Sequence, residues 1–216
     1  MIARLSGDEI EAAFFEAFPD ARSLRDPTFP LIEGFQFRQL NNAPQVFKGG
    51  MGIVFRCVGI DDEREYAIKL TSSERDLEIY RKLTEIRSQG NQLRINELIQ
   101  DKAVALKEGA APLYCMVFPW HKGDLKSFLN ELNARYPEPS NFSGNAARVF
   151  AHVLLPILRT LEKIQATVSH RDLKPENILL DWSSEGVEPF LTDFGIGKDH
   201  SSISDTNTLA HYRSEL

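Results

Sequence analysis

Residues 170–177 read His-Arg-Asp-Leu-Lys-Pro-Glu-Asn, and Asp-Phe-Gly follows at 193–195; these two motifs constrain the fold more than any other feature. Asp172 and Asn177 lie on one predicted loop. Two short predicted strands, 178–181 and 189–192, then form a hairpin that returns Asp193 to the same place. Three oxygen-bearing side chains that converge on one point suit a hard divalent cation and phosphate chemistry. The sequence therefore predicts a metal-dependent phosphate site.

Two further features lie upstream. Gly49, Gly50 and Gly52 precede an apolar run that begins at Ile53. Glycines let backbone amides approach phosphates without a Cβ in the way. Lys69 lies among apolar neighbours in a predicted strand over 65–71. Because a lone buried ammonium is costly, we expect it to be paired.

The chain divides into a strand-rich part and a helix-rich part. Strands are predicted over 53–58, 65–71 and 114–118, with a helix over 72–88. After Pro119 the signals are mostly helical: Asp124 can cap one helix, and a longer helix is expected over about 145–167. This is an α+β, two-lobed plan. The predicted boundaries are a helical extension over 1–40, a strand-rich lobe over 41–118 and a helix-rich lobe over 119–216.

Composition limits the partners and the location. The 216 residues include 25 Lys and Arg against 31 Asp and Glu, a net charge of −6, which argues against nucleic acid or an anionic membrane as partner. The most apolar long stretch, 149–161, contains a histidine, a proline and an arginine and is too short for a membrane span. No signal peptide is visible, and we expect a cytoplasmic protein. Cys57 and Cys115 lie in apolar runs and read as buried thiols of a reducing compartment.

The order of these motifs resembles the eukaryotic-like protein kinases, a family found in bacteria and eukaryotes. A glycine loop, Ala67-Ile-Lys69, a helix, a hinge strand, His-Arg-Asp and Asp-Phe-Gly follow one another over about residues 44–216. An isolated Gly-x-x-Gly is usually a hairpin turn, whereas four motifs in the correct order are specific. The resemblance implies a two-lobed kinase fold with a small β-rich N-lobe and an α-rich C-lobe.

The resemblance also implies a reaction: transfer of the γ-phosphoryl group of ATP, with Mg²⁺, to a Ser or Thr hydroxyl of a protein. Asp172 would orient the hydroxyl and accept its proton, and Lys174 would neutralise charge on the transferred group. Lys69 would hold the α- and β-phosphates, while Asn177 and Asp193 would bind magnesium. Lysine two residues after Asp172 is the pattern of Ser/Thr kinases. His170 is expected beneath the phenylalanine of Asp-Phe-Gly, and the arginine that follows could bind a phosphorylated residue.

The nucleotide contacts follow from the same resemblance. Counting back from Gly123 places Val117 at the gatekeeper and the next three residues at the adenine. Recognition would use the carbonyl one residue past the gatekeeper and the amide three past it, and a small gatekeeper predicts an accessible pocket behind the adenine. Asp124 could contact ribose, although a helix cap is the interpretation we favour. The implied nucleotide-binding set is Gly49, Gly52, Val54, Ala67, Lys69, Val117, Phe118, Trp120, Asp124, Asn177, Leu179 and Asp193.

The partner of Lys69 departs from the glutamate that is usual in the family. Positions three, four and seven after Asp76 are all apolar, as the buried face of this helix requires, whereas those after Glu78 are charged. Helical phase therefore selects Asp76, one methylene shorter than glutamate. Glu78 stays the alternative if the helix is rotated.

Two other departures bear on activity. Phe47 stands where the first loop glycine is usual. After Asp-Phe-Gly, a polar segment with Ser201, Ser202, Ser204 and Thr206 as possible phosphorylation sites leads into 208–216, which echoes the family's closing motif without its proline. We therefore expect a C-lobe that is incomplete beyond the activation segment. A pseudokinase or inactive fragment that binds nucleotide without turnover is the alternative function, and a small-molecule kinase is a third.

Overall fold

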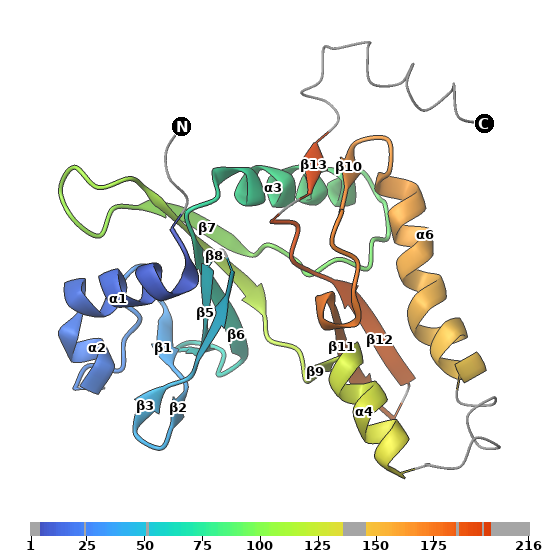
Figure 1. The fold of residues 1–216 in the computed structure, drawn as a ribbon, viewed down its shortest axis with the longest axis horizontal. Helices are drawn as coiled ribbons and strands as arrows, with labels where there is room; N and C mark the ends of the chain where they lie inside the picture. The colour runs from blue at the N-terminus through green and yellow to red at the C-terminus, as the bar shows by residue number, and fades with distance from the viewer. Residues whose placement is uncertain are drawn as a thin grey trace.

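The computed structural model describes residues 5–23, 25–50, 52–135, 146–184, 186–195 and 197–199. Its strand-rich half is an antiparallel sheet in the order β1-β5-β6-β8-β7, with β4 also paired to β5 (Figure 1). The predicted strands at 53–58, 65–71 and 114–118 are confirmed as β5, β6 and β8. The strands are β1 Phe35–Phe37, β4 Val46–Gly49, β5 Gly52–Gly59, β6 Glu65–Thr71, β7 Gln100–Val104 and β8 Leu113–Pro119.

The two faces of this sheet bury different side chains because successive residues of a strand point to opposite sides. On one face Ile53, Phe55, Ile68 and Val117 are fully buried in an outer core. On the other face Met116 and Phe118 of β8 pack toward the helix α3 (Glu74–Ser88). The predicted helix over 72–88 is therefore confirmed, and it lies on the side of the sheet that also carries Lys69.

The expected helical extension covers the outer face. Helix α1 (Gly7–Ala17) begins with a capping box in which Ser6 and Glu9 bond reciprocally, and the short α2 (Pro19–Ser23) follows. Phe14 of α1 is fully buried and its ring lies 4.6 Å from that of Phe55. Figure 1 shows α1 and α2 alongside the sheet, on the side away from α4 and α6.

The extension does not end where the sequence indicated. Residues 35–37 form β1, which is antiparallel to β5, with Phe35 opposite Gly59. Residues 39–40 and 43–44 form the two small paired strands β2 (Gln39–Leu40) and β3 (Ala43–Pro44). A three-residue strand with alternating burial is too short to give a periodic signal, and the prolines before it suggested a connector. The sheet therefore begins before residue 40.

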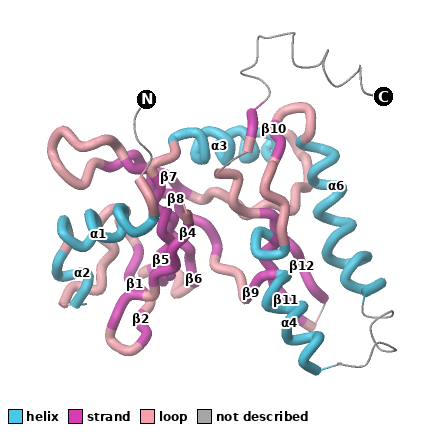
Figure 2. The backbone as a smooth tube through the Cα atoms, viewed as in Figure 1, coloured by secondary structure: helices cyan, strands magenta, loops and turns pink. Residues whose placement is uncertain are grey.

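The second half of the chain, from about residue 119, combines helices with short strands (Figure 2). Helix α4 (Leu125–Arg135) begins after Asp124, as predicted. The helix expected over about 145–167 is interrupted by a π-helical turn, η1 (Phe150–Leu154), and continues as α6 (Leu155–Ile164). Pro156, which has no N–H and clashes with the preceding turn, accounts for the interruption. The remaining elements are β9 Gly123–Asp124, β10 Val168–Ser169, the 3₁₀ turn η2 Pro175–Asn177, β11 Ile178–Ser183, β12 Gly186–Leu191 and β13 Lys198–Asp199.

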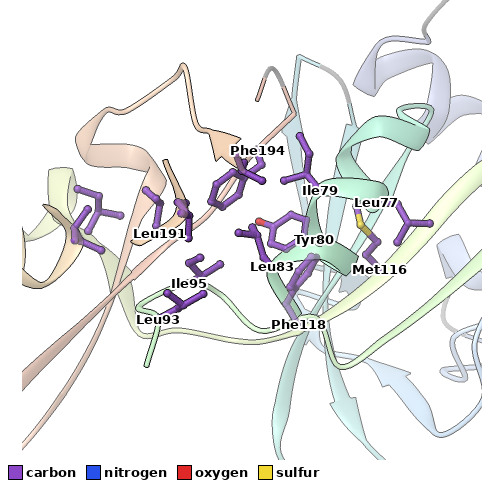
Figure 3. Close-up of a cluster of buried hydrophobic side chains, with 14 of the residues drawn as sticks. Leu77, Ile79, Tyr80, Leu83, Leu93, Ile95, Met116, Phe118, Leu191 and Phe194 are labelled. Atoms are coloured by element: carbon purple, nitrogen blue, oxygen red, sulfur yellow. The ribbon is translucent and has the colours of Figure 1, made fainter. Parts of the chain in front are cut away.

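A second hydrophobic core joins the two halves. It brings Tyr80 and Leu83 of α3 together with Phe118 of β8, Leu191 of β12 and Phe194 (Figure 3). The Tyr80 ring lies 4.7 Å from Phe118 and 5.5 Å from Phe194. Across the described ranges, no helix is long and apolar enough to cross a membrane. The shared core fixes α3 against the Asp-Phe-Gly segment, and this contact positions the site.

Candidate active site

Lys69 lies at the centre of the polar cluster. Its Nζ is 2.6 Å from Oδ2 of Asp76 and 3.1 Å from Oδ1 of Asp193. Burial alone lowers the pKa of this lysine, but the two carboxylates outweigh burial and raise the pKa above its ordinary value. The same ammonium overcomes the effect of burial on Asp193 and holds its pKa below the ordinary value. The lysine is therefore a fixed positive charge between two lobes.

Helix α3 delivers Asp76 to this lysine. Ser73 caps the helix by accepting a hydrogen bond from the Asp76 amide, so the carboxylate stands in the first helical turn. Asp76 is only 1% exposed, and among the described residues its Oδ1 has no hydrogen-bond partner. The pairing predicted from helical phase is the one that forms, with Asp76 and not Glu78. The shorter side chain reaches Lys69 through one oxygen and leaves the other buried.

The loop after His170 gathers the second group of polar residues. Lys174 Nζ donates to Oδ2 of Asp172 at 2.7 Å. Nδ2 of Asn177 donates to the carbonyl of Asp172 at 2.9 Å and to its Oδ2 at 3.1 Å. The hydrogen bond from Lys174 holds the pKa of Asp172 below its ordinary value, so the carboxylate is ionised at neutral pH.

Asp193 reaches the same region through an unusual backbone. Its φ of 61° and the φ of 68° at Arg171 lie in the left-handed region, which costs energy for residues with a side chain. The hydroxyl of Tyr80 accepts a hydrogen bond from the Asp193 amide at 3.1 Å, and the Thr192 amide donates to the carbonyl of Asn177 at 3.0 Å. These bonds hold the strained segment and join α3 to both loops. Sequence reasoning counted Tyr80 only as an apolar residue of the α3 face and missed its hydroxyl.

His170 packs against Phe194, as predicted, with ring centroids 4.6 Å apart. One ring nitrogen, Nε2, lies 2.8 Å from the carbonyl of Thr192, and the other, Nδ1, accepts from the Asp172 amide at 3.3 Å. Burial lowers the pKa of this histidine below its ordinary value of 6.5. The neutral imidazole thus bridges the loop of Asp172 and the segment of Asp193.

Acid should weaken this bridge. Below pH 6.5 the unfolded chain protonates His170 while the folded chain resists, so the unfolded state binds more protons and stability falls as pH drops. We expect the melting temperature to fall between pH 7.5 and pH 5.5 by more in the parent than in His170→Gln. Equal falls in the two proteins would show that this histidine is not the acid-sensitive group.

The glycines lie at the β4–β5 hairpin. Gly49 and Gly52 form its closing pair, and Val54 stands opposite Lys69 on the neighbouring strand β6. A Cβ at Gly52 would lie 2.6 Å from the carbonyl oxygen of Leu70, so the sheet itself requires that glycine. A Cβ at Gly50 would meet nothing within 4 Å, and at Gly49 only an ordinary contact. Packing within the protein therefore does not require glycine at positions 49 and 50, and close approach of a ligand to their backbone is a reason for glycine there.

The match to a known family agrees with this geometry. The sequence model described as "Protein kinase domain" matches residues 41–213. The chain belongs to the protein kinase family. Its relatives include the serine/threonine-protein kinase PknK of Mycobacterium tuberculosis, 31% identical over 160 residues, which are 73% of this chain and 13% of PknK. Cyclin-dependent kinase 2 of Caenorhabditis elegans is 32% identical over 169 residues, 76% of this chain and 42% of that protein.

A third relative matches a shorter stretch at a higher percentage of identical residues. Serine/threonine-protein kinase Sgk3 of Rattus norvegicus is 44% identical over 73 residues, 34% of this chain and 12% of that kinase. The chain thus spans less than half the length of each of these three relatives. The described residues fit the two-lobed kinase fold that the sequence implied, with a β-rich sheet and α3 in the first part and a partial helical region in the second.

One nucleotide contact implied by the resemblance is not supported. Val117, expected at the gatekeeper, is fully buried in the outer core and pairs with Ile68, on the face of the sheet away from Lys69. Phe118 faces α3 and Tyr80 instead. Because strand residues alternate, an error of one position in the count from Gly123 moves a side chain to the wrong face. The orientation of Val117 therefore contradicts its assignment as the gatekeeper, and the prediction of an accessible pocket behind the adenine loses its basis.

The same shift affects the hinge amide. Trp120 was expected to offer its amide to the adenine, but that N–H donates to the carbonyl of Glu65 at 3.1 Å. Moving the count by one residue would put Phe118 at the gatekeeper position, and the resemblance would then imply the carbonyl of Pro119 and the amide of His121 as the adenine contacts. The Trp120 ring instead packs 5.3 Å from Phe47 and under the guanidinium of Arg56 at 4.6 Å. Phe47, at the first loop position, therefore reaches the hinge.

The remaining predicted residues lie in the strands beside Phe118 and Asp124 or outside the described chain. Asp124 caps α4 by accepting from the amide and hydroxyl of Ser127, both at 2.9 Å, which is the interpretation we favoured. Leu179 pairs with Asp124 in the small sheet, and Ala67 pairs with Phe118. The expected phosphorylation sites Ser201, Ser202, Ser204 and Thr206 and the closing motif over 208–216 lie outside the described residues.

Proposed function

We propose that this chain catalyses transfer of the γ-phosphoryl group of ATP to a Ser or Thr hydroxyl of a protein. The observation that carries the proposal is the assembled cluster in which Lys69 binds both Asp76 and Asp193. The ion pair of the sheet lysine with α3 and the acid of Asp-Phe-Gly are both needed in an active kinase. Here both are in place together.

The donor set fits a nucleotide with magnesium. Asn177 and Asp193 are oxygen ligands of the kind that Mg²⁺ prefers, and the amide nitrogen of Asn177 is held by Asp172, which leaves a cation the amide oxygen. Bound Mg²⁺ would neutralise charge on the β- and γ-phosphates. Lys69 would bind the α- and β-phosphates, and Gly49, Gly52, Val54, Ala67, Phe118, Pro119, His121 and Leu179 would surround the nucleotide.

Within this chain, Asp172 would orient the substrate hydroxyl and receive its proton at Oδ1 or Oδ2. Lys174, which already donates to Oδ2, would balance the charge of the transferred group. The lysine keeps Asp172 ionised and so suited to accept a hydrogen bond from the hydroxyl. Lys174 itself has its pKa raised by its hydrogen bond to Asp172 and stays charged.

A protein substrate and a cytoplasmic location complete the proposal. The net charge of −6 does not suit a nucleic-acid partner. Cys57 and Cys115 are free and buried, and burial raises the pKa of Cys115 to about 12, so both thiols are inert structural groups of the kind found in reducing compartments.

Two measurements on the purified chain test the function. Mg-ATP should raise the melting temperature relative to EDTA, since ligand binding to the folded state stabilises it. Labelled ATP should then place phosphate on the chain itself or on a generic Ser/Thr protein substrate. A thermal shift without any transfer would establish the pseudokinase alternative, and phosphate found only on a metabolite would establish a small-molecule kinase.

A further inference from the structure

The N-terminal arm (residues 5–17) lies directly on the glycine hairpin formed by β4 and the start of β5. Gly7, the first residue of α1, is buried, and a Cβ at this position would fall on the carbonyl oxygen of Gly49 and 2.8 Å from that of Gly52. Both obstructing atoms are backbone, so no side chain can move aside to make room. Glycine is thus required at position 7 by the closeness of the arm to the two glycines of the hairpin.

Charge reinforces the same contact. Lys48, next to Gly49 on β4, places its Nζ 2.6 Å from Glu11 and 3.1 Å from Asp8, both on α1. The Glu11 side chain is 21% exposed, while Lys48 is about half exposed, so the pair is partly open to solvent and orients the contact more than it stabilises the fold. The hydrogen bonds from Lys48 to Glu11 and Asp8 raise the pKa of the lysine.

The arm is rigid enough to hold the hairpin. Ile10 and Phe14 of α1 are fully buried in the outer core, so the helix cannot slide without exposing them. The arm makes fewer contacts with the residues just before α3. The Leu5 amide donates to Oγ of Ser72 at 3.1 Å, and Leu5 also lines a cavity of about 300 Å³ beside Ser72 and Glu74. The close-packed contact is with the hairpin.

The direction of the contact matters for phosphates. A trans peptide keeps its C=O and N–H on opposite sides, so an amide whose oxygen faces α1 turns its N–H away from α1. The carbonyl of Gly49 faces Gly7, and therefore the N–H of Gly50 is directed away from the arm. Backbone N–H groups of such a loop are the groups that bind phosphates.

We propose that the N-terminal arm positions the glycine hairpin for the nucleotide phosphates, with Gly7 and Lys48 as positioning residues. This inference rests on the proposed nucleotide binding and adds a part of the chain that precedes the match to the kinase family. The arm sets which way the hairpin amides point, and the hairpin then binds the phosphates without having to be ordered by them.

The first test adds bulk at the contact. Gly7→Val should speed hydrogen exchange of the amides over 46–54 in the nucleotide-free chain and raise the Kd for Mg-ATP by about tenfold or more, because a hairpin that is no longer held in its binding geometry must be ordered by the ligand, which costs affinity. The control is Ala12→Val, which adds the same kind of bulk at an exposed position of α1 and should change neither value. Circular dichroism establishes that both variants are folded.

The second test uses charge and does not depend on packing. Lys48→Glu should raise the Kd for Mg-ATP several-fold, and adding Glu11→Lys should recover most of that loss, with hydrogen exchange over 46–54 following the same order. A Gly7→Val chain that binds Mg-ATP like the parent, or a charge swap without recovery, overturns the role of the arm. A parent that does not bind Mg-ATP overturns the proposed function instead.

Discussion

Lys69→Met should abolish phosphoryl transfer and also lower the free energy of unfolding by about 3–5 kcal/mol, the usual cost of removing one partner of a buried ion pair. The carboxylate of Asp76 is 1% exposed, and its Oδ1 already has no partner among the described residues. Without Lys69, Oδ2 would lose its charge partner as well. The loss of stability should be visible as a lower midpoint in urea unfolding at neutral pH.

A second substitution separates stability from activity. In Lys69→Met with Asp76→Leu the buried charge is gone and the site is apolar, so most of the stability should return. Phosphoryl transfer should not return, because nothing replaces the ammonium that faces Asp193. A Lys69→Met chain that is as stable and as active as the parent would contradict the central place given to this ion pair. A double variant that is less stable than Lys69→Met would show that Asp76 is satisfied in another way.

Local rules predicted the parts of the site that depend on short-range geometry. The periodicity of α3 identified Asp76 as the partner of Lys69, because only one helical phase places a carboxylate and three apolar residues on one face. The cap at Asp124 and the packing of His170 on Phe194 likewise follow from neighbouring residues or from a motif.

Features that depend on register or on distant partners could not be predicted in this way. The gatekeeper assignment failed because the number of residues between β8 and Gly123 cannot be read from a motif, and a shift of one reverses the face of Val117. Strand β7 has an exposed, polar sequence, and it is a strand only because it pairs along β8. The hydroxyl of Tyr80 gave no signal, because its partners Thr192 and Asp193 lie over 110 residues away.

The N-terminal extension shows the same limit. Its amphipathic pattern predicts a helix that packs on a flank, and α1 does so. That the flank is the outer face of the sheet, with Gly7 on the hairpin carbonyls, depends on contacts across more than 40 residues. A glycine at the first position of a helix is unremarkable in the sequence, and only the folded chain shows why a larger residue would not fit there.

Asp172→Asn should reduce kcat by about 10²–10⁴-fold, the range that a positioned general base contributes. The amide keeps the size of the carboxylate but cannot accept the hydroxyl proton at neutral pH. The Kd for Mg-ATP should change little, since Asp193, Asn177 and Lys69 are untouched. Steady-state transfer rates with a generic Ser/Thr protein, beside calorimetric titration with Mg-ATP, measure the two quantities separately.

The hydrogen bonds of the loop make this substitution informative. Asn177 donates to the backbone carbonyl of residue 172 at 2.9 Å, a bond that the variant keeps, and an asparagine oxygen can still accept from Lys174. The loop should therefore stay in place, and the loss should fall on kcat alone. The control is Glu188→Gln on β12. It neutralises an exposed carboxylate that is paired with Arg94, and it should leave both kcat and the Kd for Mg-ATP unchanged. A variant that keeps the parent kcat would remove Asp172 from the chemical step, while an equal loss in Mg-ATP affinity would assign it to binding.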